Sequence, residues 1–429
     1  MSDAPAPTSP PPAACDVLVI GAGPAGSACA QALARAGRRV VLVDQHSFPR
    51  DKVCGDGLIP DAHHAFKRLG VHDEVMAAAQ PVAHVACIGP RGGRVDVPGR
   101  LAVLPRRQLD DILKRAAERA GAVFAAPWRF QAPLVEGDRV VGATLVPHGM
   151  AGSPVEVRAR WVVLATGAQP QALLAAGMCQ RQVPSGVALR GYIHHPGMVE
   201  RIKALEVVWH KRLSRGYGWI FPCRDGVFNI GVGLAHSHRS LADGHGRMQD
   251  VNLRQMFEAF TAVHPPAAEL VAGGTWTGPM KGAPLRCTLD GARYSRPGLL
   301  VTGEAAGSTY AFTGEGIGKA METGLLAAEA LVQSPPGAEA RAHAGGDSEA
   351  DAAVRTRYEA GLATLKPRFD LYERANRVNE HPWLADLVIW RANKSPRILR
   401  RMAGVLEETD NPGRLVSLRG IAKLFLPIG

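Results

Sequence analysis

The sequence predicts an α/β protein in which a mostly antiparallel sheet interrupts a domain built around a parallel sheet, with a helical C-terminal region after it. Residues 15–43 read as an apolar strand, a glycine turn, an alanine-rich helix and a second apolar strand. Residues 297–332 return to the order of strand, glycine-rich loop and long helix. Between them, residues 183–294 hold short alternating strands and glycine turns, which are typical of an antiparallel sheet. A recurring pattern split by a different one indicates an interrupted domain.

The elements of the first unit follow from residue type and spacing. Residues 15–20 are apolar and β-branched, as in a strand buried on both faces, and residues 40–43 form the next strand. The alanine-rich stretch 24–36 favours a helix that ends at Gly37. The segment 46–60 carries glycines, prolines and charges, and is expected to lack regular structure.

Two helical patterns and one hairpin are expected next. Apolar residues recur at helical spacing over 61–79 and over 104–121, where Gly121 ends the helix. Residues 139–147 and 155–166 have the composition of two paired strands.

Composition limits the class of protein. The chain has 429 residues, enough for two or three domains, with 46% hydrophobic and 21% charged residues. It contains no apolar run of about 18 residues, so no transmembrane helix is expected. The proline-rich N-terminus lacks the basic start and apolar segment of a signal peptide, and the seven cysteines are scattered. These features predict a cytoplasmic protein with reduced thiols and no metal site.

The charge balance predicts an anionic partner. Fifty basic against 39 acidic residues give a formal charge of +11. No zinc-finger spacing or RNA-binding signature is present, so nucleic acid is not expected. A phosphate-bearing cofactor or substrate, or an anionic membrane surface, fits the charge better.

The stretch "GAGPAG" has the pattern of a dinucleotide-binding turn. Gly21 permits the tight turn, Gly23 lets the backbone approach a pyrophosphate, and Gly26 lets the helix pack on the strand. Asp44 ends the second strand, where it can accept a hydrogen bond from a ribose hydroxyl. The alternative is a purely structural turn. A second glycine-rich segment, 303–317, leads into a helix whose positive end can face a flavin ring, which favours FAD.

Five stretches together carry a family resemblance: "GAGPAGSACA", "KVCGDGLIP", "RRQLDDIL", "GYGWIFP" followed by "GVG", and "GEAAGSTYAFTGEGIGKAMETG". The chain resembles the geranylgeranyl reductase family of FAD-dependent oxidoreductases, which share the para-hydroxybenzoate hydroxylase-like fold. The resemblance implies a Rossmann-type FAD-binding domain. It implies that the cofactor is held by Gly21, Gly23, Ala25, Gly26, Asp44, Cys54, Gly55, Arg107, Gly167, Gly303, Glu304, Gly314, Gly316 and Ile317. From composition alone, the alternative interpretation of Arg107 is a solvated helix charge.

Two positions depart from relatives of this fold. Glu304 stands where relatives usually have Asp, and Thr166-Gly167 stands where hydroxylases have Asp-Gly. The second departure argues against hydroxylase-like use of NADPH. The electron donor is expected to be NAD(P)H or ferredoxin.

Cys54 is the predicted catalytic residue. The resemblance places it near the flavin ring, and Lys52 beside it in sequence is expected to acidify the thiol, making it a proton donor. The alternative is a small buried apolar thiol.

The resemblance also implies a pocket for a polyprenyl chain, formed by Tyr217, Trp219, Phe221, Pro222, Gly231 and Gly233. Side chains two apart on a strand share a face, so the three rings form one wall, which is either core or pocket. The expected function is reduction of carbon–carbon double bonds in an isoprenoid chain. The alternatives are an FAD-dependent monooxygenase acting on a hydrophobic or aromatic substrate, and a lipid-binding flavoprotein without turnover.

The C-terminal segments mix aromatic and basic residues. Trp383, Trp390 and Phe425 lie among arginines and lysines, among them Arg391, Lys394, Arg397, Arg400, Arg401, Arg414, Arg419 and Lys423. Such segments fit a peripheral contact with the inner membrane face, or helices packed on the protein with a solvated basic side.

The expected division of the chain has eight parts. They are a disordered tail (1–13), three FAD-binding parts (14–80, 101–180 and 295–333), joining strands (81–100), an antiparallel substrate domain (181–294), a disordered insertion (334–352) and a helical C-terminal region (353–429).

Overall fold

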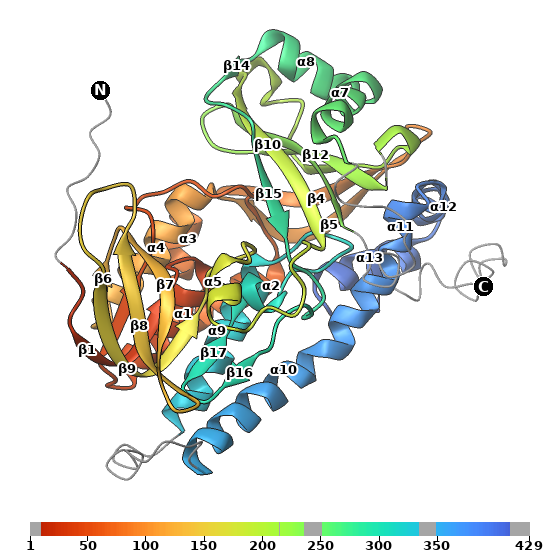
Figure 1. The fold of residues 1–429 in the computed structure, drawn as a ribbon. Coiled ribbons are helices and arrows are strands. Elements are labelled where there is room, and N and C mark those ends of the chain that lie inside the picture. Colours follow the sequence, from red (N-terminus) through yellow and green to blue (C-terminus); the bar gives the residue numbers. More distant parts are fainter. Residues whose placement is uncertain (1–9, 214, 236–250, 334–348, 412–429) are drawn as a thin grey trace.

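The computed structural model describes residues 10–213, 215–235, 251–333 and 349–411 (Figure 1). Its first sheet confirms the predicted parallel core. The strand order is β16-β17-β9-β1-β2-β6, and every neighbouring pair is parallel except β16 with β17. Their bounds are β1 Ala14–Ile20, β2 Val40–Val43, β6 Val123–Ala125, β9 Val155–Leu164, β16 Ser295–Arg296 and β17 Leu299–Val301. All the side chains of β2 are buried, as expected for a strand covered on both faces.

Three helices pack together beside this sheet: α1 (Pro24–Arg35), α4 (Arg106–Arg119) and α9 (Ile317–Val332). Helix α1 ends where Gly37 takes a φ of 77°, as the sequence predicts. Helix α9 crosses α1 so closely that a Cβ at Gly324 would lie 2.2 Å from the carbonyl oxygen of Ala25. The close crossing holds the middle of α9 against the first turn of α1.

Other parts of this region differ from expectation in detail. The predicted helix 61–79 is two helices, α2 (Pro60–Leu69) and α3 (His72–Ala78), because Gly70 takes a φ of 68° and ends the first. The short strand β3 (Gly57–Leu58) lies in the segment expected to be irregular and pairs with β5. The predicted hairpin is present as β8 (Arg139–Pro147) and β9, but β7 (Trp128–Glu136) also pairs with β8. A short helix, α5 (Gln171–Ala175), follows β9.

The second sheet has the order β14-β10-β13-β12-β11-β4-β5-β3, with β15 pairing with β10. It is mostly antiparallel as predicted, and the pair β11–β4 is parallel. The bounds are β4 Gln80–Ile88, β5 Arg94–Val103, β10 Gly186–His194, β11 Leu205–Val208, β12 Gly216–Pro222, β13 Val227–Ala235, β14 Thr275–Trp276 and β15 Lys281–Leu285.

Helices cover the outer face of the second sheet, where the sequence predicted only strands and turns. Helices α7 (Leu253–Val263) and α8 (Pro265–Gly273) lie at the top of Figure 1. Ile220 and Ile230 of the sheet pack with Phe260 of α7 in one apolar cluster. The odd-numbered rings of β12 therefore face the other way, toward the first sheet.

The C-terminal helices run from the first sheet to the second (Figure 1). They are α10 (Glu349–Ala375), α11 (Arg377–Glu380), α12 (Trp383–Ala392) and α13 (Pro396–Leu406). Residues 349–352 begin α10, so the prediction of disorder there is wrong, because Asp351 is buried in an ion pair with Arg139. Residues 334–348 and 412–429, with Arg414, Arg419, Lys423 and Phe425, lie outside the described residues. No helix among the described residues is long and apolar enough to cross a membrane.

Candidate active site

A cavity of about 780 Å³ lies where the two sheets and the C-terminal helices meet. Its volume is in the upper part of the range for ligand pockets. One half is polar and surrounds the β1–α1 turn, with Gly21, Asp44 and Arg50 in its wall. The other half is apolar and extends between the second sheet and α12 and α13. The cavity thus joins two chemically different compartments.

The polar half is built on the β1–α1 turn. Gly21 takes a φ of 102°, and a Cβ at Gly26 would lie 1.8 Å from the carbonyl oxygen of Gly21, so both positions require glycine. Gly26 serves helix packing and is not part of the cavity wall. Asp44 accepts hydrogen bonds from the backbone N–H groups of Ala22 and His46, both at 2.9 Å. These bonds fix the acid at the end of β2, on the wall of the cavity.

Two arginines bring positive charge to the space above this turn. A Cβ added at Gly23 would find only Arg50 Nη2 at 3.6 Å and Arg106 Nη2 at 3.8 Å as close neighbours. Both guanidinium groups pair with the fully buried Asp110, Arg50 at 2.9 Å and Arg106 at 2.6 Å. Burial lowers the pKa of Arg106, but Asp110 and then Cys54 outweigh this effect and raise it overall. Open space at a helix N-terminus with two fixed cations fits a pyrophosphate.

Arg107, the predicted cofactor contact, is exposed on α4 and is not part of the cavity wall. The arginine in the wall is its neighbour Arg106. Adjacent residues on a helix point about 100° apart, so the one-residue difference moves the side chain from the cavity to solvent. Arg50 was not predicted, because it lies in a loop with no regular spacing.

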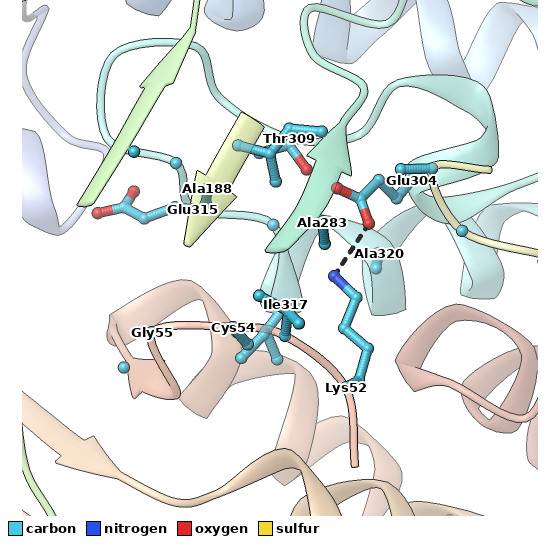
Figure 2. Close-up of a pocket in the computed structure, with 18 of the residues that line it drawn as sticks. Lys52, Cys54, Gly55, Ala188, Ala283, Glu304, Thr309, Glu315, Ile317 and Ala320 are labelled. Carbon is cyan, nitrogen blue, oxygen red and sulfur yellow. Dashed lines mark hydrogen bonds and ion pairs between the residues drawn. The ribbon is translucent and has the colours of Figure 1, made fainter. Parts of the chain in front are cut away.

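A second wall of the cavity, called the loop wall, consists of the loop 52–57, the segment 303–317 and the start of α9 (Figure 2). Lys52 Nζ pairs with Glu304 at 3.2 Å, and both residues line the cavity together with Cys54, Ala320 and Ile317. Gly55, Gly167, Gly314 and Gly316 also line the cavity, whereas Gly303 does not. A Cβ at Gly303 would lie 2.6 Å from Ala25 Cβ, so its small size serves packing. Thr166 Oγ1 is buried and has no hydrogen-bond partner among the described residues, which fits a site that receives a polar ligand.

Cys54 is half-buried in this wall. Its Sγ accepts a hydrogen bond from the backbone N–H of Asp56 at 3.3 Å. Lys52, which the sequence places beside the thiol, is paired with Glu304, and Arg106 also interacts with the Cys54 side chain. Arg190 Nε and Asn229 Nδ2 donate to the carbonyl oxygen of Cys54 at 3.3 and 2.8 Å, which pins this loop to the second sheet.

Two acidic residues of the site were not predicted from the sequence. Asp56 is fully buried and accepts hydrogen bonds from Tyr192 Oη and from Asn229 Nδ2, the latter at 2.7 Å. Burial raises the pKa of Asp56 to about 6, although Tyr192 opposes this rise. Glu315 lines the cavity (Figure 2). Both acids stand between two glycines, in "GDG" and "GEG", and that pattern is the signal that would have found them.

The three rings of β12 form one wall of the cavity. The ring centroids of Tyr217 and Trp219 are 6.2 Å apart and those of Trp219 and Phe221 are 6.4 Å apart. Phe221 packs on the loop of Cys54, because a Cβ at Gly55 would lie 3.2 Å from its ring. The rings therefore lie between the loop wall and the apolar half.

The other predicted pocket residues support this wall in different ways. A Cβ at Gly231 would lie 2.4 Å from Trp219 Cζ2, so Gly231 makes room for the indole and does not itself line the cavity. Gly233 does line it. Pro222 ends β12 opposite Phe228 and is outside the wall.

The apolar half comes from elements far apart in sequence. Its wall consists of aliphatic side chains and a few sulfur-containing ones: Val85, Cys87, Val97, Leu205, Val207, Ala385, Val388, Ile389, Met402, Val405 and Leu406. Strands β4, β5 and β11 form one side and helices α12 and α13 the other. Such a compartment favours a long ligand without polar groups along its length.

Comparison with known proteins agrees with this geometry. Residues 14–217 match the FAD binding domain family. Menaquinone reductase of Mycolicibacterium smegmatis is 34% identical over 342 residues, which cover 74% of this chain and 76% of the relative. Digeranylgeranylglycerophospholipid reductase 1 of Methanopyrus kandleri is 29% identical over 322 residues, covering 74% and 80%. The crystal structure of a geranylgeranyl bacteriochlorophyll reductase-like protein from Thermoplasma acidophilum has a TM-score of 0.68 at 20% identity, covers 96% and 95% of the two chains, and shares the fold.

The fold, the dinucleotide turn and the matched FAD domain define an FAD-dependent oxidoreductase. Within that class, the similarity to the reductases covers about three quarters of each chain. The chain belongs to the geranylgeranyl reductase family of FAD-dependent oxidoreductases.

Proposed function

We propose that this enzyme reduces carbon–carbon double bonds in a polyprenyl chain. The observation that carries the proposal is the apolar compartment that opens directly onto the wall formed by Cys54, Gly316 and Ile317. An isoprenoid chain has no polar group along its length, so its binding depends on buried apolar area, at about 25 cal/mol per Å². The side chains of β4, β11 and α12 supply that area.

Different residues of the chain would bind different parts of the cofactor and substrate. Arg50, Arg106 and the N-terminus of α1 would hold the pyrophosphate, and Asp44 would accept a hydrogen bond from the ribose. Lys52 and Glu304 would hold the ribityl chain, and the start of α9 would lie at the flavin ring. Reduced FAD, when bound, supplies two electrons and one hydrogen of the reduction. The rings of Trp219 and Phe221 keep water from the reacting double bond, and an acid of the wall supplies a proton, for which the sequence predicts Cys54.

The substrate class follows from the relatives' names. The most similar relative reported above is named for menaquinone, and the second for a digeranylgeranyl glycerophospholipid. Both compounds combine a polyprenyl chain with a polar end. A prenylated quinone is therefore the first substrate to test, and a geranylgeranyl lipid the second.

The exposed side of α12 supports a contact with the membrane that stores such lipids. Trp383 and Trp390 are 58% and 43% exposed, and Lys394 lies over the Trp390 ring at 4.7 Å. The opposite side of the same helix lines the apolar compartment through Val388 and Ile389. Aromatic and basic side chains suit the headgroup region, so α12 is proposed to rest there and admit the prenyl chain.

The test is a reaction of the photoreduced holoenzyme without oxygen. Added menaquinone or geranylgeranyl lipid should reoxidise the flavin and yield a product heavier by about 2 Da for each reduced bond. Reoxidation only in the presence of oxygen, with an oxygenated product, would instead establish the monooxygenase alternative. No reoxidation by any such substrate would leave a binding role. Initial reduction by NADPH, NADH and reduced ferredoxin, compared side by side, identifies the electron donor.

A further inference from the structure

Glu315 lies in the wall of the cavity on the loop that leads into α9. It is held between Gly314, which takes a φ of 69°, and Gly316, which precedes the first residue of the helix. Glu315, Cys54 and Gly55 all line the cavity, and Figure 2 labels all three. Among the described residues, no lysine, arginine or histidine lies within ion-pair distance of its carboxyl group. The group is an acid with access to the site and without a paired cation.

Behind Glu315 lies a buried cluster of charges. Lys319 Nζ on α9 is 2.6 Å from Glu322, 2.9 Å from Glu408 and 3.9 Å from Asp61 of α2. The side chains of Lys319, Asp61 and Glu408 are 3%, 6% and 9% exposed. Glu322 is 36% exposed, so the cluster extends from behind the cavity to the surface.

Other groups face the same cluster. Arg368 of α10 pairs with Glu408, and Tyr310 Oη donates to Glu408 at 2.7 Å. Tyr372 stacks on Tyr310 with ring centroids 3.9 Å apart. On the cavity side, Tyr217 Oη donates to the carbonyl oxygen of Thr313 at 2.8 Å. The acids of the cluster therefore outnumber the cations, Lys319 and Arg368.

An excess of buried acids favours protonated carboxyl groups. The pKa of Glu315 is raised well above its ordinary value, first by burial and then by the negative charges of Asp61 and Glu408, while Thr313 and Lys319 oppose the rise. Burial raises the pKa of Asp61 to about 7, and both its carboxylate oxygens lack a hydrogen-bond partner among the described residues. Burial and the neighbouring acids thus favour the protonated form of Glu315 at the cavity.

We propose that Glu315 is the catalytic acid that protonates the substrate, and that the acidic side chains of Asp61 and Glu408 favour the protonated form of its carboxyl group. The inference rests on the proposed reduction of a prenyl double bond. In that reaction the π bond breaks, one carbon gains a hydride equivalent as reduced FAD is oxidised, and the other carbon gains the proton of Glu315. The carboxylate left behind regains a proton from water before the next turnover.

A variant that keeps the shape of the side chain but cannot donate a proton tests the acid. Glu315→Gln should bind FAD normally and reoxidise the reduced flavin at least about 100-fold more slowly with a prenyl substrate, the usual contribution of a general acid. Glu329→Gln, at a surface glutamate of the following helix α9, is the control and should react at the wild-type rate. Cys54→Ser tests the competing donor. The inference is overturned if Glu315→Gln reoxidises the flavin at the wild-type rate while Cys54→Ser does so at least about 100-fold more slowly.

Infrared spectroscopy of the oxidised holoenzyme provides a second readout that needs no turnover. At neutral pH the difference between the wild-type and Glu315→Gln spectra should contain the carbonyl-stretching band of one protonated carboxylic acid. Asp61→Asn removes a negative charge that raises the pKa of Glu315, so the midpoint of this band should move to lower pH. Absence of the band, or an unmoved midpoint, contradicts the proposal. If the wild-type enzyme reduces no prenyl double bond, the proposed function is refuted. If the wild type and Glu315→Gln reduce the double bond equally well, only the role of Glu315 as the acid is refuted.

Discussion

Tyr217 donates its phenolic hydroxyl to the carbonyl oxygen of Thr313 at 2.8 Å and so ties β12 of the second sheet to the loop before α9. Gly314 accommodates the same hydroxyl, since a Cβ there would lie 2.5 Å from it. The first ring of the aromatic wall therefore also positions the loop that carries Glu315 and Gly316.

Tyr217→Phe removes only this hydrogen bond, because the aromatic ring stays in the wall. The free energy of unfolding should fall by about 1 kcal/mol, and FAD should bind more weakly as the loop loosens. Urea denaturation and fluorescence titration of the apoprotein with FAD measure the two effects. If the variant binds FAD as tightly as the wild type, this hydrogen bond does not position the loop for FAD binding.

Arg106 and Arg107 offer a matched pair of variants. Arg106→Lys keeps the charge but loses the planar fork that pairs with Asp110 and faces the β1–α1 turn, so FAD should bind at least about tenfold more weakly. Arg107→Ala removes an exposed side chain and should bind FAD like the wild type. Titration of the two apoproteins decides the assignment, and the reverse order of affinities would contradict it.

Val388 tests the path of the prenyl chain. Val388→Phe places a larger ring in the apolar compartment, so KM for a long polyprenyl substrate should rise at least about tenfold, at a stability cost of about 1–3 kcal/mol. A substrate with a single isoprene unit should be affected much less. Val332→Phe, at an exposed position that ends α9, is the control. Equal effects on long and short substrates would place the chain elsewhere.

Asp61 predicts a pH-dependent stability. Its pKa of about 7 in the folded state lies above the ordinary value of 3.8, so the folded protein binds the proton more tightly than the unfolded chain. The stability of the wild type relative to Asp61→Asn should therefore fall as pH rises from 3.8 to 7, by up to about 1.4 kcal/mol per unit, and level off above. Urea denaturation at pH 5.5 and pH 8 measures this. A difference between the two proteins that stays constant with pH would contradict the burial of an ionisable Asp61.

The membrane contact rests on the outer side of α12. Replacing both Trp383 and Trp390 by alanine should weaken binding to anionic phospholipid vesicles at least about tenfold, while leaving FAD content unchanged. Vesicle co-sedimentation at low and moderate salt measures this binding. Val199→Ala, which changes an exposed apolar residue elsewhere, is the control. Binding equal to the wild type would remove α12 from the interface.

Sequence by itself determined the features that depend on neighbours in the chain. The turn of Gly21 and Gly23, the strands around it and the shared face of Tyr217, Trp219 and Phe221 follow from backbone sterics and from a period of two residues, which are local. The family resemblance, carried by ordered motifs, was confirmed by relatives that cover about three quarters of the chain.

Tertiary structure alone decided which side chains meet. It placed Arg106 in the cavity and Arg107 in solvent, paired Lys52 with Glu304 across 252 positions, and brought α12 against β4 to form the apolar compartment. It also made Asp61 and Glu315 weak acids, because their pKa values depend on burial and on Glu408, a residue far along the chain. Burial and charge coupling arise between segments distant in sequence, so no local pattern encodes them.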